Sequence, residues 1–349
     1  MEQNSVIIVV PCAALNEYVV ECLRECARLD HDAYRIVLLP DAPVALPQEL
    51  GSVPITVIPT GDVTIAAKRN AAIRRFPDTA YYAFIDSDAY PRRDWLHQGI
   101  ASFTRGDRWA VGGPCLSPPD EPLLQRVVGN ATRSVLVSGN LAFSKRVSAS
   151  RYCLNLHSCN LIVSGQALRR IGGFHEELTT GEDRELCRRI RNAGGKIYFD
   201  RQVIVYHHNR RLGTHFFSQR VVHGHSIFGI MAADKGWYNV LLFVPLLTVA
   251  LTGTVFLLGF AHGAGFILAG VLVGLYLVMA ATAAVSSSSS PKEAALTLWA
   301  IITANAGYVI GSVAGLFRAK LDFKKLYANY RGPRGRRRPL MAAERSRKN

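Results

Sequence analysis

The stretch YYAFIDSDAYP (Tyr81–Pro91) places two carboxylates directly after an apolar run. Residues 81–85 are typical of a buried strand, and side chains two apart in an extended chain point the same way, about 6–7 Å apart. Asp86 and Asp88 therefore aim at one spot, where they repel each other unless a cation lies between them. A hard divalent ion such as Mg²⁺ suits such oxygen ligands and completes its shell with substrate phosphates. A solvated turn explains the same composition, so this stretch alone leaves both interpretations open.

The segments around it alternate between strand and helix patterns. The predicted strands cover residues 6–10, 34–39, 53–58 and 81–85, and the predicted helices cover residues 17–29, 64–76 and 94–103. This alternation predicts an α/β fold with a doubly wound, mostly parallel sheet. Asp94 is expected to cap the last of these helices. Ligands of such sheets bind beyond the carboxyl ends of the strands, where Asp41, Asp86 and Asp88 lie.

A second pair of acids follows in TTGEDRELCRRI (Thr179–Ile190), where Glu182 and Asp183 open a predicted helix over residues 183–192. The helix dipole favours acids in a first turn, which is a structural explanation. A carboxylate beside an acceptor hydroxyl can also take its proton as a general base. Both explanations stay open for this motif alone.

Three further segments complete the predicted elements. Residues 164–171 are expected to form a helix and residues 196–206 a strand. Residues 214–231 mix aromatic and aliphatic side chains with Arg220 and three histidines, which predicts an amphipathic helix in a membrane interface.

The C-terminal third is apolar enough to cross a membrane. Residues 238–290 contain no Lys, Arg, Asp or Glu, and about 53 residues of helix would extend roughly 80 Å against a hydrocarbon core of about 30 Å. Two helices joined by a turn at Ala261–Gly265 use this length, and residues 294–317 provide a third candidate crossing. The alternative of a buried hairpin in a soluble protein is disfavoured, because soluble helices need a polar face.

The formal charge of +15 is concentrated in the tail, where residues 318–349 hold 12 basic and 2 acidic residues, a net +10. Beside a membrane segment, this tail predicts contact with anionic lipids. Nucleic-acid binding is the rival interpretation, and we expect no nucleic-acid partner, because aromatic residues are scarce after Tyr330. The positive-inside tendency favours a cytoplasmic tail. Three full crossings would put it outside, so either one segment does not cross, with residues 305–315 as a candidate for re-entrant packing, or the interfacial segment counts differently.

The first 235 residues are expected to stay in the cytoplasm. Seven cysteines without a CxxC pair suggest reduced thiols, and the N-terminal apolar run is too short for a signal peptide. The predicted organisation is a catalytic domain (1–212), an amphipathic interfacial segment (213–236), a transmembrane region of two to three helices (237–317) and a basic tail (318–349).

The order of four segments, VIIVVPCAALNE, AKRNAAI, YYAFIDSDAYPRRDWL and LIVSGQALRRIGGFHEELTTGEDRELCRRIRNAGGKIYFDRQVIVYHH, followed by apolar helices, resembles a family-2 glycosyltransferase of the GT-A fold. The resemblance covers about residues 5–230. It implies a nucleotide-sugar donor and a Mg²⁺ or Mn²⁺ cofactor.

The resemblance assigns residues by position. The implied nucleotide-sugar-binding residues are Pro11, Asn16, Glu17, Asp41, Lys68, Arg69, Asn70 and Asp86, and the implied metal ligands are Asp86, Asp88 and His207, with His208 as the competing histidine. Asp183 matches the catalytic base, with Glu182 beside it. Asn160 and Gly173 fall on the acceptor side, and Arg220 either meets a phosphate of a lipid-linked acceptor or snorkels at the interface.

A single base without a second nucleophilic carboxylate implies one displacement, hence inversion at the anomeric carbon. The expected enzyme is a hexosyltransferase-type, metal-dependent enzyme of the inner membrane that acts on a lipid-linked or glycan acceptor hydroxyl in envelope polysaccharide assembly. The Gln-x-x-Arg-Trp motif of processive synthases is absent, since Gln219 and Arg220 are adjacent. The alternatives are a polyprenyl-phosphate glycosyltransferase and a catalytically inactive membrane adaptor.

Overall fold

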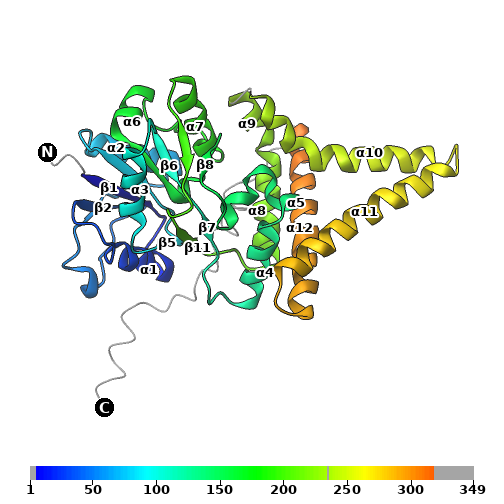
Figure 1. Cartoon of the computed structure of the whole chain (residues 1–349), viewed down its shortest axis with the longest axis horizontal. Helices are drawn as coiled ribbons and strands as arrows, with labels where there is room; N and C mark the ends of the chain where they lie inside the picture. Colours follow the sequence, from blue (N-terminus) through cyan, green and yellow to red (C-terminus); the bar gives the residue numbers. More distant parts are fainter. Residues whose placement is uncertain (1–4, 234–235, 318–349) are drawn as a thin grey trace, which may run out of the picture.

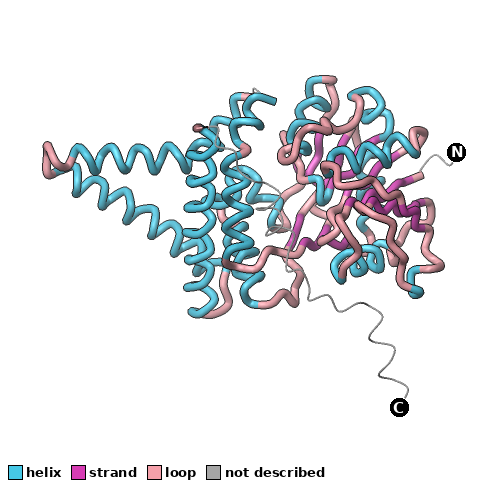
Figure 2. The backbone as a smooth tube through the Cα atoms, turned by 180° about the vertical axis from the view of Figure 1, so that it is seen from behind, coloured by secondary structure: helices cyan, strands magenta, loops and turns pink. Residues whose placement is uncertain are grey.

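The computed structural model describes residues 5–233 and 236–317. A sheet-containing domain is followed by a layer of helices, from which a helical hairpin projects (Figures 1 and 2). The predicted basic tail, residues 318–349, lies outside the described residues.

The main sheet has eight strands in the order β3-β2-β1-β4-β9-β6-β10-β8. Its strands are β1 (Val6–Pro11), β2 (Tyr34–Leu39), β3 (Ile55–Val57), β4 (Tyr81–Phe84), β6 (Ala110–Gly112), β8 (Arg151–Tyr152), β9 (Leu161–Ser164) and β10 (Ile197–Phe199). The four strands predicted before residue 90 are confirmed as β1–β4, and they run parallel. Strands β8 and β9 run antiparallel to their neighbours, so the sheet is mixed and mostly parallel.

Helices cover both faces of this sheet. They are α1 (Glu17–Cys26), α2 (Ile65–Arg75), α3 (Trp95–Thr104), α6 (Gly165–Ile171) and α7 (Glu182–Asn192). Side chains alternate along β1: Ile8 packs with residues of α1 and α3 in one core, and Val9 packs with residues of α2, α6 and α7 in the other. Burial on both faces explains why β1 is apolar throughout.

A second sheet of three strands, β5 (Ala89–Pro91), β11 (Val205–His207) and β7 (Cys115–Leu116), lies beside the first. The prediction of one strand over residues 196–206 is wrong, because β10 ends in a turn in which Val203 N donates to Asp200 O, and β11 then joins the other sheet. The predicted cap is also wrong. Asp94 occupies the N-cap position of α3, but its carboxylate accepts from Arg92 instead of from the helix backbone.

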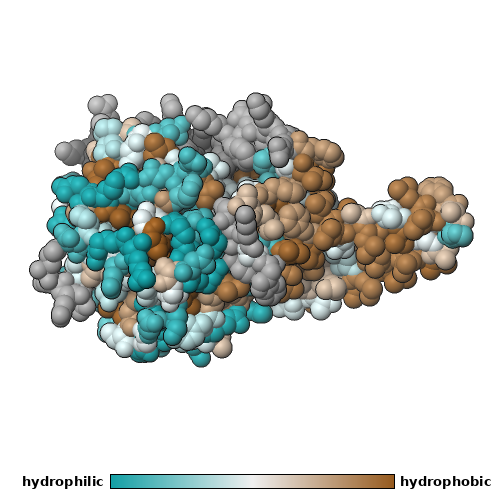
Figure 3. All heavy atoms as spheres, turned by 90° about the horizontal axis from the view of Figure 1, so that it is seen from above, coloured by the Kyte–Doolittle hydropathy of each residue, from teal (hydrophilic) through white to brown (hydrophobic). Residues whose placement is uncertain are grey.

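The helical layer contains α4 (Leu123–Thr132), α5 (Val135–Ser138), α8 (Thr214–His225), α9 (Ile227–Ala233) and α12 (Pro291–Leu316), and the hairpin is formed by α10 (Val244–Leu258) and α11 (Ala264–Ser287). Three helices, Asn239–Leu258, Ala264–Ser287 and Pro291–Leu316, are long and apolar enough to cross a membrane. Figure 3 shows the hairpin as a hydrophobic projection beside a hydrophilic domain.

The predicted helix over residues 214–231 is split into α8 and α9, and α8 packs against α12. A Cβ added to Gly224 would lie 2.0 Å from Tyr308 O, and one added to Gly311 would lie 2.0 Å from Val221 O. Only glycine permits this backbone-to-backbone approach. The contact of α8 with a membrane surface stays a prediction.

Candidate active site

The Asp-Ser-Asp motif follows β4, and β11 brings a histidine to it. Pairing of β11 with β5 sets His207 opposite Ala89, and its Nε2 lies 3.7 Å from Asp86 Oδ2 and 3.4 Å from Asp88 Oδ1. Arg210 Nη2 lies 3.1 Å from the other Asp88 oxygen. His208 points elsewhere, since its Nε2 lies 2.7 Å from Glu21 Oε2. Of the two adjacent histidines, His207 is therefore the one that faces the aspartates.

Charges around this motif shift the pKa of two groups. Burial raises the pKa of Asp86, but the neighbouring imidazole of His207 and the charge of Arg69 outweigh burial and lower it to about 2. Burial lowers the pKa of His207, but the charge of Asp88 and the neighbouring carboxylate of Asp86 outweigh burial and raise it to about 9. The carboxylate of Asp86 is thus ionised and the imidazole of His207 is protonated at neutral pH, so a positive charge of the protein already lies beside the motif.

Arg69 of α2 connects the two acidic motifs. Its side chain is 1% exposed, its Nη2 donates to Asp86 at 3.0 Å, and its Nη1 donates to Glu182 at 2.7 Å. The ring of Phe174 lies 5.3 Å from the guanidinium carbon and covers it. One buried arginine therefore joins the end of β4 to the start of α7.

The start of α7 follows Gly181, which has a positive φ of 77°. Burial and then the charge of Asp183 raise the pKa of Glu182, despite the ion pair with Arg69. Asp183 accepts from the backbone N–H groups of Ser158 at 3.3 Å and Arg184 at 2.7 Å. Because Arg69 engages Glu182, Asp183 is the carboxylate of this pair that has no arginine or lysine partner among the described residues.

The predicted nucleotide-side residues lie at the carboxyl ends of β1 and β2. Lys68 is buried, and its Nζ donates to Asp41 at 2.5 Å and to the carbonyl oxygens of Cys12 and Leu39. These hydrogen bonds hold the carboxyl ends of β1 and β2 together. Pro11 pairs with Leu39 in the sheet register.

Two further nucleotide-side predictions fall at the start of α1. Asn16 caps this helix by accepting from Val19 N at 3.0 Å, and Glu17 is exposed in its first turn. The joined ends of β1 and β2 and the N-terminus of α1 thus lie at this edge of the sheet. The nucleotide contacts of these residues stay predictions.

Three other predicted residues have structural partners. The Asn70 side chain donates to Phe174 O and Glu176 and accepts from Phe174 N. A Cβ on Gly173 would lie 2.6 Å from Asn70 Oδ1. Asn160 accepts from Trp95 Nε1 and donates to two backbone carbonyls. These contacts hold the loops around the site in place, and direct contacts with donor or acceptor stay predictions.

Arg220 lies between helices and not in the acidic centre. Its guanidinium donates to Val137 O at 3.0 Å and stands 5.1 Å from the Tyr308 ring centroid. Burial lowers its pKa to about 10. The acceptor contact predicted for it stays a prediction.

Sequence reasoning missed a thiol at the centre. Among the described residues, one oxygen of Asp86, the Sγ of Cys159 and one nitrogen of His207 lie within 4.8 Å of one another. Cys159 also lies 3.2 Å from the Sγ of Cys115. The antiparallel pairing of β9 with β4 brings Cys159 to Asp86, and no local sequence signal reports such a pairing. Carboxylate, imidazole and thiol are all ligands for divalent transition metals, so this donor set fits a metal ion.

A cavity of about 370 Å³ opens beside Asp88. Its wall combines Tyr18 with the apolar residues Leu123 and Leu124 at the start of α4, and Arg211 adds a positive charge. The centre is therefore open to a ligand of mixed polarity.

Residues 5–154 match the family model described as Glycosyl transferase family 2. The sequence of this part of the chain is thus similar to that of family-2 glycosyltransferases, and its α/β sheet has the GT-A fold. The chain is 26% identical over 166 residues to pre-mycofactocin glycosyltransferase from two strains of Mycobacterium tuberculosis, a match that covers 46% of this chain. The chain spans about a third of the length of these curated relatives, since the match covers 33% of them.

A solved structure of similar fold is the mannosyltransferase PcManGT from Pyrobaculum calidifontis in complex with GDP-Man and Mn²⁺. The TM-score is 0.53 at 17% identity, and the match covers 90% of this chain and 88% of that one. At this identity the likeness shows the fold alone.

Proposed function

We propose that the chain is a membrane-bound, inverting glycosyltransferase that moves a sugar from a nucleotide-sugar donor to the hydroxyl of a lipid-linked or glycan acceptor. The observation that carries this proposal is the Arg69 bridge, which puts the Asp-Ser-Asp motif and the Glu182–Asp183 pair in one centre. The similarity of the domain to glycosyltransferases supports the reaction type.

In this proposal, each group of site residues has a separate role. Asp86, Asp88 and His207 would hold a divalent ion, Mn²⁺ or Mg²⁺, which would stabilise the negative charge of the leaving diphosphate. His207 would have to be neutral to serve as one of these ligands, because a metal ion binds the deprotonated ring nitrogen. Lys68 and Asp41 keep the strand ends together for the nucleoside, and Arg69 fixes the donor side relative to α7.

Asp183 acts as the general base. Its two oxygens accept backbone hydrogen bonds that fix the carboxylate at the start of α7, and it takes the proton of the acceptor hydroxyl as the oxygen attacks the anomeric carbon. The new glycosidic bond forms on the face opposite the leaving nucleoside diphosphate, which gives inversion.

We place the protein in the inner membrane with its catalytic domain on the cytoplasmic side, where nucleotide sugars are made. The three apolar helices support membrane attachment. The basic tail would contact anionic lipids, which agrees with the positive-inside tendency.

A second acceptor class, a polyprenyl phosphate, is favoured by one observation. The cavity beside Asp88 joins an apolar wall to exposed Arg211, which suits an isoprenoid phosphate. Such an acceptor attacks through a phosphate oxygen and needs no strong base.

The proposal is tested by incubating the full chain in detergent with a panel of nucleotide sugars, Mn²⁺ and membrane lipid extract. We expect release of a nucleoside diphosphate for one donor and an acceptor product of inverted configuration. A chain that binds nucleotide sugars but never turns them over, whatever the acceptor, would be an inactive adaptor and would refute the proposal.

A further inference from the structure

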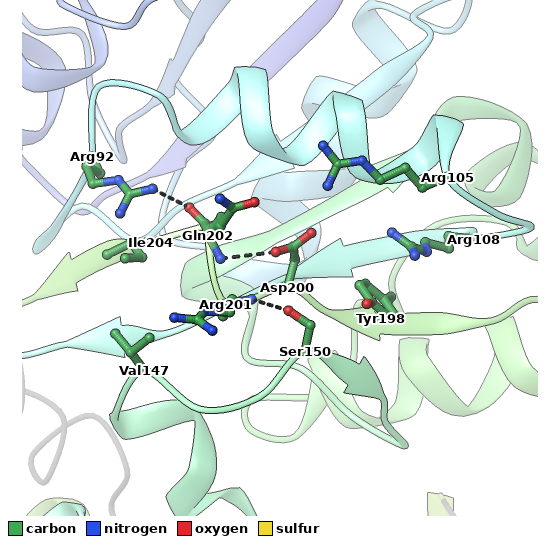
Figure 4. Close-up of a pocket in the computed structure, with 10 residues that line it drawn as sticks. All are labelled: Arg92, Arg105, Arg108, Val147, Ser150, Tyr198, Asp200, Arg201, Gln202 and Ile204. Atoms are coloured by element: carbon green, nitrogen blue, oxygen red, sulfur yellow. Dashed lines mark hydrogen bonds between the residues drawn. The ribbon is translucent and has the colours of Figure 1, made fainter.

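A cavity of about 580 Å³ lies outside the acidic centre, and arginines from four segments surround it (Figure 4). Arg92 follows β5, Arg105 follows α3, Arg108 precedes β6 and Arg201 follows β10. Figure 4 shows these side chains around one space, with Asp200 and Tyr198 beside them. A convergence of guanidinium groups from separate segments is a property of the fold and not of one charged stretch of sequence.

The charges around this cavity do not cancel. Arg92 is neutralised by Asp94, whose oxygens lie 2.5 and 2.7 Å from its nitrogens. Asp200 is 5% exposed, and its two oxygens accept from Ser102 Oγ and from Gln202 N. Within the described part of the chain, no carboxylate lies within 4.0 Å of a side-chain nitrogen of Arg105, Arg108 or Arg201. Three positive groups therefore face a cavity that contains one shielded carboxylate.

One of these arginines is held rigidly. The guanidinium carbon of Arg108 lies 3.5 Å from the centroid of the Tyr198 ring, and its Nη1 donates to the backbone and side-chain oxygens of Ser102. Its Nε is buried and has no hydrogen-bond partner within the described residues. A guanidinium fixed in this way, beside those of Arg105 and Arg201, which have no ion pair within the described residues, is preorganised for an anion, because little side-chain entropy of Arg108 remains to be lost on binding.

The position of the cavity relates it to the catalytic centre. Ile204 lines it and directly precedes β11, whose last residue is His207. Three residues of extended chain correspond to about 10 Å. None of the residues assigned to the acidic centre lines the cavity, so the cavity and the acidic centre are separate.

We propose that this arginine pocket is a second binding site, which takes a phosphate-bearing ligand. Planar guanidinium groups bind phosphate oxygens in a bidentate manner, and three uncompensated arginines suit a phosphate or diphosphate group. Tyr198, Ile204 and exposed Val147 provide an apolar wall for the part of the ligand that carries the phosphate. A soluble phosphate compound and a phospholipid headgroup share this chemistry.

The test is calorimetric titration of the full chain in detergent with inorganic pyrophosphate, in EDTA so that no divalent ion occupies the acidic centre. The variant Arg105→Ala/Arg201→Ala removes two exposed side chains without touching the core. We expect its affinity for pyrophosphate to fall about tenfold or more, because two charge-assisted contacts are lost. The matched control Arg35→Ala/Arg75→Ala removes the same charge from exposed positions elsewhere and should change affinity less than about twofold.

A second arm identifies the source of the phosphate. The same two double variants and the unaltered protein are floated with vesicles of phosphatidylcholine that contain or lack phosphatidic acid. Arginine-dependent flotation with phosphatidic acid assigns the pocket to a headgroup, and pyrophosphate binding alone assigns it to a soluble compound; either supports the proposal. If the pocket variant and the control variant behave alike in both arms, the pocket is only a basic surface and the proposal is overturned.

Discussion

Glu182 accepts a hydrogen bond of 2.7 Å from Nη1 of Arg69, and the other Nη of this arginine lies 3.0 Å from Asp86. Asp86 and Glu182 are far apart in sequence and belong to the two motifs that have different tasks in the proposed reaction. Their common partner is 1% exposed, so little water competes for its hydrogen bonds. The geometry of donor and acceptor sides thus depends on one side chain.

Replacement of this arginine tests the bridge. We expect Arg69→Ala to lower the free energy of unfolding by about 2–4 kcal/mol, because it leaves two carboxylates without their buried partner, while partial exposure of Asp86 moderates the cost. Thermal unfolding in detergent measures this change. Arg24→Ala, which breaks the exposed pair with Glu49, should cost less than about 1 kcal/mol. Equal losses in the two variants would contradict the bridge.

Replacement of Asp183 by asparagine tests its proposed role as the general base. Asp183→Asn retains size and cannot take a proton, so kcat should fall about 10²–10⁴-fold while donor affinity changes little. Glu182→Gln is the comparison, because it weakens the Arg69 bridge and should affect stability more than Asp183→Asn does. A loss of donor binding without a loss of kcat would assign Asp183 to the donor side. A small effect of Asp183→Asn on turnover would favour the polyprenyl-phosphate acceptor.

Metal dependence follows from the aspartates. Removal of divalent ions with EDTA should abolish turnover, and Mn²⁺ or Mg²⁺ should restore it. Asp86→Asn/Asp88→Asn should weaken Mn²⁺ binding by about 100-fold or more, since direct ligands matter more than the outer-shell partners. Mn²⁺ electron paramagnetic resonance measures this binding. Asp94→Asn, at the carboxylate paired with Arg92, serves as control, and an equal effect there would refute the assigned ligands.

The position of Cys159 beside Asp86 and His207 leads us to expect that Zn²⁺ and Co²⁺ bind at this centre. Because thiolates prefer Zn²⁺ and Co²⁺ to Mg²⁺, Zn²⁺ should inhibit the Mn²⁺-loaded enzyme, and Co²⁺ should give a thiolate-to-metal absorption band in the near ultraviolet. Cys159→Ser should remove the band and the inhibition. Cys153→Ser, at a thiol outside the cluster, should retain both. A band that persists in Cys159→Ser would exclude this thiol as a ligand.

The α8–α12 contact predicts which glycines are irreplaceable. Gly311→Leu should lower stability by about 2 kcal/mol or more, because its Cβ would stand 2.0 Å from Val221 O and backbones have to separate. Gly274→Leu in α11 meets nothing within 4 Å and should be neutral. Thermal unfolding in one detergent compares the two, and similar melting temperatures would show that the helices separate easily.

Much of the domain could be predicted from local pattern. The apolar runs at β1, β2 and β4 are buried on both faces, and their periodicity is readable without tertiary information. The prediction of a single strand over residues 196–206 was wrong, because the chain turns at Asp200 and then enters a second sheet. The pattern of apolar and polar side chains does not indicate such a change of sheet. The prediction that Asp94 caps α3 was wrong, because Arg92, two residues away, binds the carboxylate in place of the helix backbone.

The candidate site was predictable to the extent that its residues follow strands or open a helix. Asp86 and Asp183 belong to that group. The pairing of Arg69 with both motifs, the approach of Cys159 and the orientation of His207 relative to His208 all depend on how β9 and β11 pair with distant strands. Such pairings are set by the whole fold, and a single sequence carries no direct record of them.

Glycine in both α8 and α12 leaves no side chains between their backbones, so α8, which directly follows the sheet-containing domain, is fixed against one of the three apolar helices. The reacting centre then stands at a constant height above whatever layer the three apolar helices occupy. A substrate anchored in the same layer has to span that height itself. In the proposed reaction with a lipid-linked acceptor, the distance from the anchor of the acceptor to its nucleophilic oxygen would then be a criterion by which acceptors are selected.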